Sequence, residues 1–243
     1  MSTDQVLWCL AVFAVAACVQ SIGGFGFALF AVPLMALVID LPDAVIAGSI
    51  ASLANVVVLS LRSLADVEWS VARRFNIPAF FGMPLGLWVL VHADEEMLKV
   101  GLGVVIVVLI VVLMRTRAKS QPRPIVEVIA GLCSGVLATS TSTNGPPLVF
   151  AAQLRGMRPD QFRATLSFTF ALQGAISLAA FVIAGEASRE AVLVALLGLP
   201  LVAVGQWLGE LIRPRVQGKR FERLVYALLG LSAVSVSWSG LFG

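Results

Sequence analysis

The most unusual stretch of this chain is a run of six consecutive hydroxyl and amide side chains, residues 139–144, inside a long apolar segment. These groups are neutral hydrogen-bond donors, so such a run can hold an oxyanion without a buried positive charge. The "GPP" at 145–147 suits the first turn of a helix, which Thr143 or Asn144 would cap. The pattern predicts a helix N-terminus beside neutral donors, although capping or helix-to-helix bonding alone would also account for the run.

A second break is predicted at "SIGGFG", residues 21–26. Gly23, Gly24 and Gly26 let the backbone turn sharply and leave its N–H groups unobstructed. A helix N-terminus carries about half a positive charge and several free N–H donors. If the helices that follow the two breaks both point their N-termini at one cavity, they form an anion site.

Three polar side chains elsewhere are candidates for the same site. Asn55 and Gln173 lie in the middle of apolar segments, either as donors to the cavity or as structural bonds between helices. Arg163 begins an apolar segment and either contacts an anion or only marks the cytoplasmic side. The chain has one histidine, His92, and three cysteines at no metal-ligand spacing, so neither a metal nor a cofactor site is predicted.

The elements that position these residues are expected to lie in a lipid bilayer. Of 243 residues, 59% are hydrophobic and 13% are charged, and the mean hydropathy is +0.96, which is far outside the range of soluble domains. Apolar runs recur from end to end, so neither a soluble domain nor a nucleic-acid partner is expected. The apolar stretch 6–20 lacks a basic segment and a cleavage site, which indicates a mature helix rather than a signal peptide.

The basic residues gather in alternate loops, which marks those loops as cytoplasmic. The basic clusters lie at 62–75, 115–123, 155–163 and 213–223. The short and mostly acidic loops between them lie at 40–43, 92–96 and 185–190. By this assignment 15 of the 17 Lys and Arg face the cytoplasm, and both termini lie on the periplasmic side of a bacterial inner membrane.

The predicted fold class is an all-α polytopic membrane protein made of two inverted repeats, residues 1–124 and 125–243. Each repeat has a broken helical hairpin followed by three transmembrane helices. The hairpins are predicted at 5–39 and 125–154, and the spans at 43–61, 76–92, 97–115, 163–184, 191–212 and 222–241. A short surface helix is expected at 64–75.

Two internal similarities support the repeat. Residues 41–60 laid on residues 158–177 match at five of twenty positions. The glycines of "GMPLG" at 82–86 recur in "GQWLG" at 205–209, where small residues would allow close helix approach.

At its two breaks the sequence resembles the sulfite exporter TauE/SafE family of small bacterial permeases. The resembling motifs are "SIGGFGFALFAVPLMALV" at 21–38 and "GLCSGVLATSTSTNGPPLVFAAQLRGMRPDQFRAT" at 131–165. The resemblance covers the whole chain and implies transport of sulfite, sulfoacetate or a related sulfonate, usually as export. This chain has "STSTN" where the family's second break is often rich in glycine. By position, the resemblance implies a substrate site made of Ser21, Gly23, Gly24, Gly26, Thr141, Ser142, Thr143, Asn144 and Gly145.

Together these features predict an exporter of small sulfur-containing anions that works by alternating access around a mid-membrane site. No carboxylate is expected near mid-membrane, which argues against a proton relay. An anion channel, or an uptake permease for another small oxyanion or carboxylate, would use the same breaks. An intramembrane enzyme is disfavoured because no nucleophile-and-base motif or metal motif occurs. An accessory subunit and a homodimer stay open.

Overall fold

The structure, a computed structural model, describes residues 1–94, 97, 100, 104 and 124–212. In these residues the chain forms eight α-helices and one 3-10 turn. In chain order they are α1 (Thr3–Gly23), α2 (Phe27–Met35), α3 (Leu41–Arg62), the 3-10 turn (Leu64–Asp66), α4 (Trp69–His92), α6 (Pro124–Ser140), α7 (Gly145–Arg155), α8 (Pro159–Ala184) and α9 (Arg189–Ile212). The predicted span 222–241, and all but three positions of the predicted span 97–115, lie outside the described residues.

The expected all-helical class is confirmed. Five of the described helices, α1, α3, α4, α8 and α9, are long and apolar enough to cross a membrane. Their lengths of 21 to 26 residues exceed the about 20 residues that a bilayer requires. A helix satisfies its own backbone hydrogen bonds, which is the condition for crossing lipid.

The prediction of a separate surface helix at 64–75 is wrong. Only Leu64–Asp66 form a short turn, and from Trp69 onward the chain already belongs to α4. Val71 and Phe75 are fully buried in a cluster with Leu148 of α7. Val67, Val71 and Phe75 therefore pack inside the protein, whereas Leu64 and Trp69 are exposed, so the stretch does not form the apolar face of a separate surface helix.

Each predicted hairpin is a pair of helices with a short break between them. Residues 24–26 separate α1 from α2, and residues 141–144 separate α6 from α7. Both breaks are shorter than predicted, because α1 continues through Gly23 and α6 continues through Ser140.

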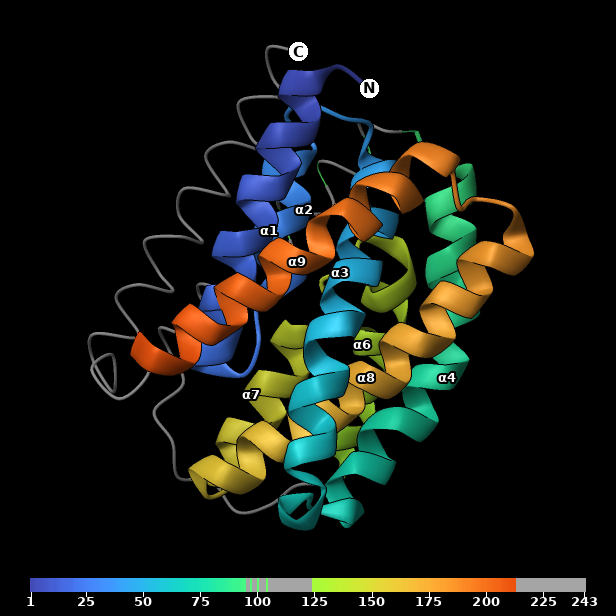
Figure 1. Ribbon diagram of the computed structural model, residues 1–243. Helices are drawn as coiled ribbons and strands as arrows, with labels where there is room; N and C mark the ends of the chain where they lie inside the picture. The colour runs from blue at the N-terminus through green and yellow to red at the C-terminus, as the bar shows by residue number, and fades with distance from the viewer. Residues whose placement is uncertain (95–96, 98–99, 101–103, 105–123, 213–243) are drawn as a thin grey trace.

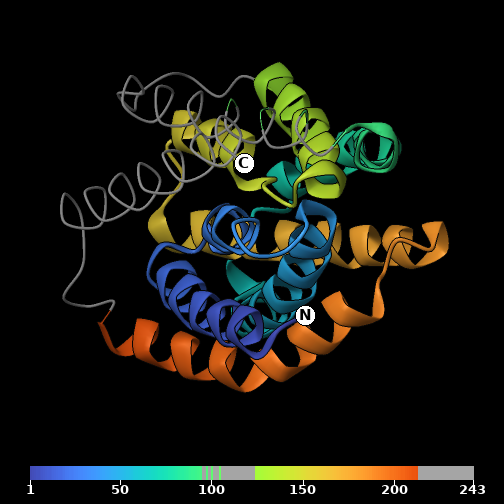
Figure 2. The ribbon, with the colours of Figure 1, turned by 90° about the horizontal axis from the view of Figure 1, so that it is seen from above.

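The helices are arranged around a central pair. α3 packs against α8 in the middle, α1 pairs with α9 on one side, and α4 pairs with α6 on the other (Figures 1 and 2). α2 lies against α1 and α3, and α7 lies against α6 and α8. Each half-length helix is thereby enclosed by longer ones, which keeps the broken backbone inside protein.

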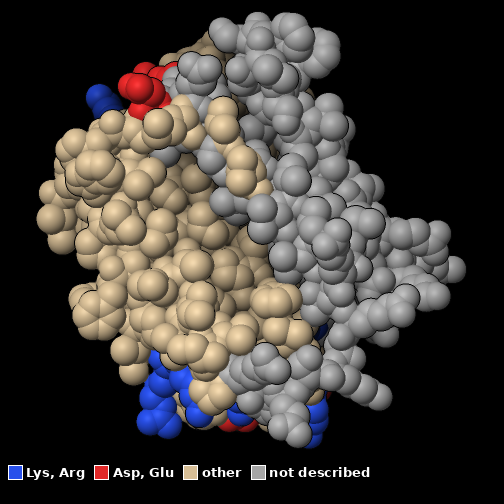
Figure 3. All heavy atoms as spheres, turned by 180° about the vertical axis from the view of Figure 1, so that it is seen from behind, with Lys and Arg blue, Asp and Glu red and all other residues tan. Residues whose placement is uncertain are grey.

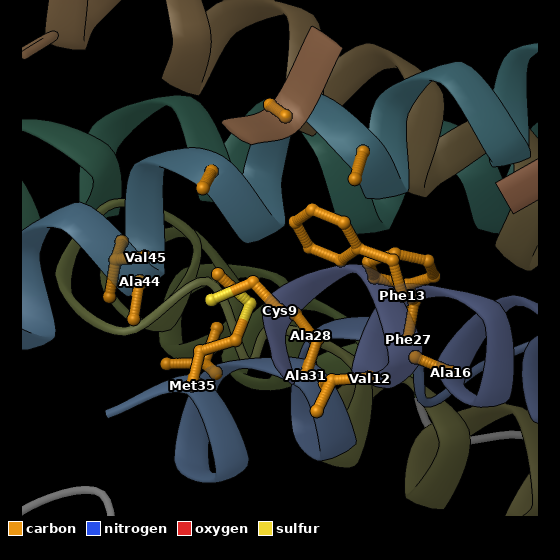
Figure 4. Packing of buried hydrophobic residues seen from close by; sticks show 14 of the residues in the cluster. Cys9, Val12, Phe13, Ala16, Phe27, Ala28, Ala31, Met35, Ala44 and Val45 are labelled. Carbon is orange, nitrogen blue, oxygen red and sulfur yellow. The ribbon is translucent and has the colours of Figure 1, made fainter. Parts of the chain in front are cut away.

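The first hairpin is held by a core of small and aromatic side chains. Phe13 of α1 and Phe27 of α2 stack with ring centroids 5.9 Å apart. Figure 4 shows them with the small residues of α1, α2 and α3 that surround them. The alanines let the helix axes approach closely, so that the large rings fill the remaining space.

The two outer helix pairs depend on glycine. A Cβ on Gly135 of α6 would strike the backbone of Ala79 in α4, and one on Gly205 of α9 would strike the carbonyl of Ala14 in α1. Close approach of this kind stabilises helix pairs in lipid, where no hydrophobic force remains between them. The close approach expected at the glycines of 82–86 and 205–209 is confirmed.

On the described part of the face in Figure 3, charged side chains gather at the two ends of the molecule, with an uncharged band between them. At the basic end, Arg74 of α4 and Arg155 of α7 both bond the carboxylate of Glu127 in α6, at 2.9 and 2.8 Å. Glu127 is 2% exposed, so its charge is neutralised by two partners rather than by water. This ion cluster joins both legs of the second hairpin to α4.

Gly135→Ala should destabilise the protein. The added Cβ has no room against the Ala79 backbone, and overpacking of this kind costs about 1–3 kcal/mol. We expect a lower melting temperature in detergent. Gly174→Ala on α8 is the matched control, because its Cβ would make only an ordinary 3.4 Å contact with Leu53. Equal melting temperatures for the two variants would contradict the close packing of α4 on α6.

Candidate functional site

The N-terminal turns of α2 and α7 meet at one cavity. Its lining also comes from α1, α3 and α8, and its polar members include Gln20, Ser52, Thr143 and Asn144. The cavity has a volume of about 20 Å³, enough for about one water molecule. Ser52 and Phe170 lie at the middle of α3 and α8, which puts the cavity halfway along the spanning helices.

α2 opens onto the cavity with uncapped backbone amides. Gly26 has a left-handed φ of 105°, which lets the chain enter the helix abruptly, and no side chain caps this terminus. The amides of Phe27, Ala28 and Leu29 have no carbonyl partner within a helix that starts here. All three residues line the cavity, so the positive end of the α2 dipole faces it.

α7 presents a second helix N-terminus to the same cavity. Asn144 occupies the cap position, as one of the two predicted alternatives, but its side chain makes no capping bond. Its Nδ2 donates instead to Oε1 of Gln173 at 2.7 Å. Because Pro146 and Pro147 have no N–H, α7 contributes the amides of Asn144 and Gly145 together with the end of its dipole.

The first two hydroxyls of the run 139–144 belong to the structure of α6. Thr139 donates to the carbonyl of Met83 in α4 at 2.6 Å, and Ser140 donates to the carbonyl of Val136 at 2.8 Å. The alternative reading, helix-to-helix bonding, therefore holds for Thr139.

The later hydroxyls form the second break itself. The Oγ1 atoms of Thr141 and Thr143 lie 2.7 Å apart, and Thr143 lines the cavity. Ser142 has a φ of 56°, the sole left-handed residue other than glycine in the described ranges, and its Oγ accepts a bond from Ser49 of α3 at 2.8 Å. A strained conformation fixed by a bond from another helix is typical of functional sites.

Two amide side chains outside the cavity lining form hydrogen bonds with residues that line it. Oε1 of Gln173 accepts from both Asn144 and Ser134, and Nδ2 of Asn55 donates to Oε1 of Gln20 at 2.6 Å. Of the two roles left open for Gln173 and Asn55, cavity donor or structural bond between helices, the structure shows the second, since each bonds a residue of another helix that lines the cavity. Their role in this structure is to orient Asn144 and Gln20.

Arg163 braces the first break from α8. Its Nη2 donates to the carbonyl of Ser21 at 3.3 Å, and a Cβ on Gly24 would come within 3.1 Å of its side chain. Its buried Nε has no hydrogen-bond partner among the described residues. Arg163 is not part of the cavity lining.

The structure brings part of the predicted site together. The predicted residues that line the cavity are Gly26, Ser142, Thr143, Asn144 and Gly145. The others lie outside the lining: Ser21, Gly23, Gly24, Thr141, Asn55, Gln173 and Arg163.

Sequence reasoning missed Gln20 and Ser52. Gln20 directly precedes Ser21, and Ser52 lies one helical turn before Asn55. Each of the two is therefore a polar side chain next to a predicted site residue. The missing information was which helix face turns toward the breaks, and that is decided by packing.

The site has the chemistry of an anion receptor. The side chains that line the cavity are uncharged, and its donors are hydroxyls, amides and two helix N-termini. No group of His, Cys, Asp and Glu in residues 1–94 and 124–212 could hold a metal ion.

Comparison with known proteins gives a consistent picture. The family described as "Sulfite exporter TauE/SafE" matches residues 9–236. A curated protein of Cupriavidus necator, named "Probable sulfite/organosulfonate exporter TauE", is 21% identical over 227 residues, which cover 88% of this chain and 87% of that protein. No solved structure shows a significant match.

Gln173→Leu should weaken both the fold and the site. The loss of Oε1 leaves Nδ2 of Asn144 without an acceptor, at a cost of about 1–3 kcal/mol, whereas Ser134 keeps the carbonyl of Asn144 as its acceptor. We expect a lower melting temperature and weaker anion binding, because Asn144 is no longer held. Gln206→Leu is the matched control, since its buried Nε2 has no partner among the described residues. If Gln173→Leu behaved like this control, the proposed orientation of Asn144 would be wrong.

Proposed function

Because the chain belongs to the sulfite exporter TauE/SafE family of multi-pass membrane transporters, which are not enzymes, we propose that it exports small sulfur oxyanions or organosulfonates through the cavity between α2 and α7. The similar protein of Cupriavidus necator is named as a probable sulfite/organosulfonate exporter. The substrate class proposed for this chain rests on that likeness together with the chemistry of its own cavity.

One observation carries the proposal: two uncapped helix N-termini face the same uncharged cavity. Each terminus contributes about half a positive charge, and the amides of Phe27, Ala28, Leu29 and Gly145 are donors that no helix carbonyl uses. An anion held in this way needs no buried Lys or Arg. It is therefore bound without the cost of a permanently buried charge when the site is empty.

We propose that the chain is an inverted repeat, residues 1–124 and 125–243, whose halves rock around the cavity. Helix pairing supports this, because the first helix of each hairpin packs against the last described helix of the other half. α1 pairs with α9, and α6 pairs with α4. Under a two-fold relation between the halves these are the same contact, and glycines mediate both.

The small size of the cavity fits a closed conformation, which both an alternating-access transporter and a gated channel would adopt. A space for about one water molecule is too small for a sulfonate group. In this proposal the anion is admitted when the two halves move apart, and the present conformation is a closed one. An anion channel, or an uptake permease for another small oxyanion or carboxylate, remains the alternative that transport assays test.

Charge placement supports the proposed orientation. Of the described Lys and Arg, only Arg189 lies at the acidic end, and basic ends face the cytoplasm. The N- and C-termini are then periplasmic in a bacterial inner membrane. Possible pairing of two copies as a homodimer stays a prediction.

Thr143→Ala and Asn144→Ala should each weaken anion binding at least about ten-fold, which corresponds to about 1.4 kcal/mol. Each removes a polar group that lines the cavity. Binding to the purified protein would be measured by calorimetry with sulfite, sulfate, thiosulfate, taurine, isethionate, sulfoacetate and acetate. The matched control is Ser140→Ala, which removes a hydroxyl of the same run that bonds its own helix.

Selective binding of sulfite or a sulfonate, lost in both cavity variants and kept in Ser140→Ala, is the expected result. Undiminished anion binding in the two cavity variants would show that the anion site lies elsewhere in the protein. Failure of the parent protein to bind any of these anions would remove the proposed substrate class.

Transport should respond to membrane potential and not to a proton gradient. A potential of 100 mV contributes about 2.3 kcal/mol per charge, so isethionate should accumulate about 50-fold in proteoliposomes whose lumen is 100 mV positive. A potassium diffusion potential and a pH jump would be applied separately. Accumulation driven by the pH jump alone would contradict potential-driven export.

A further inference from the structure

A second cavity adjoins the first. It is equally small, with a volume of about 20 Å³. Four residues line both cavities: Ser52, Ser142, Asn144 and Phe170. The second cavity adds the hydroxyls of Ser49 and Ser177, and none of its lining side chains is charged.

The second cavity lies toward the acidic end of the molecule. α3 starts at that end, and Ser49 precedes Ser52 by about one turn. α8 runs the opposite way, and Ser177 lies seven residues, or about 10 Å, beyond Phe170. The two cavities are therefore stacked along the direction in which the spanning helices run.

Ser177 has a buried hydroxyl with no partner. It is 1% exposed, and its Oγ makes no hydrogen bond to any described residue. Other helical serines avoid this state, since Ser21 and Ser140 donate to the carbonyl four residues earlier. A buried hydroxyl without a partner costs about 1–3 kcal/mol. Its partner is thus expected to come from whatever enters the cavity.

Ser142 stands between the two cavities. Its Oγ accepts a bond from Ser49, which leaves its own hydroxyl proton free to be donated. Because Ser142 lines both cavities, that proton can point into either one. The Phe170 ring also lines both and would lie 3.6 Å from a Cβ on Gly145, so it packs over the start of α7.

We infer that the second cavity is an exit-side subsite for the transported oxyanion, which passes from the first cavity by exchanging hydrogen bonds at Ser142. The inference rests on the proposed function of the first cavity. The ligand is a small oxyanion whose oxygens accept bonds from Ser52, Ser142 and Ser177. Both α2 and its free amides belong to the first cavity alone, so the second holds the anion less tightly, as release requires.

Ser177→Val and Ser177→Ala test the subsite. The first fills the cavity and removes the hydroxyl, and the second removes only the hydroxyl. Sulfite binding would be measured on the purified protein, and sulfite flux would be measured in proteoliposomes. Ser167→Val is the matched control, because Ser167 is a buried serine of the same helix that lines neither cavity.

We expect Ser177→Val to bind sulfite within two-fold of the parent while its flux falls at least ten-fold. The sulfite flux of Ser177→Ala should lie between the fluxes of Ser177→Val and the parent. Ser167→Val should transport sulfite as fast as the parent. Normal flux in a folded Ser177→Val, or in Ser177→Ala should the valine variant not fold, would overturn the subsite. Loss of sulfite binding in proportion to the loss of flux would show that the two cavities are one binding site, which would also overturn the separate subsite.

The failure of the inference is distinguishable from that of the proposed function. A parent protein that neither binds nor transports sulfite overturns both for this anion. A parent that does both, with flux unaffected by either Ser177 variant, overturns the second cavity alone.

Discussion

The organisation of this protein follows from one constraint: backbone N–H and C=O groups cannot remain unpaired in an apolar surrounding. The chain breaks its helices at residues 24–26 and 141–144, among helices that are long and apolar enough to cross a membrane. Both breaks are enclosed by longer helices, and side chains of α3 and α8 hold them in place. Among the backbone groups without a partner inside their own helix are N-terminal amides of α2 and α7 that face one cavity. The constraint that makes a break costly thus also concentrates donors where an anion can use them.

The two helix N-termini are not equivalent. α2 supplies three consecutive amides after Gly26, whereas prolines remove two of the corresponding donors from α7. Hydroxyls compensate on that side, since Thr143 and Ser142 come from the same break. Backbone amides are rigid donors, whereas a hydroxyl can rotate its proton. The site therefore combines a fixed half and an adaptable half, which suits a ligand that must be bound and then released.

No charged side chain of the described residues lines the cavity. Glu127 joins three helices through Arg74 and Arg155 at the basic end. Arg163 reaches inward only as far as the carbonyl of Ser21. In the proposed function, an anion that approaches from the basic end meets attractive charge first and neutral donors later. Neutral donors bind less strongly than a buried cation would, so under this proposal the anion is not trapped at mid-depth.

The sequence by itself determined the helical class, the location of both breaks and part of the cavity lining, Gly26 and residues 142–145. Hydropathy, glycine, proline and hydroxyl side chains act locally, so their consequences can be predicted from neighbouring positions. Only the tertiary structure decided that α2 and α7 begin at the same cavity, and that Gln20 and Ser52 line it while Asn55 and Gln173 stand behind. It also turned Val71 and Phe75 inward, against the expected surface helix. The reason is physical: a helix presents several similar faces to its surroundings, and close contacts such as Gly135 on Ala79 select the face that is buried.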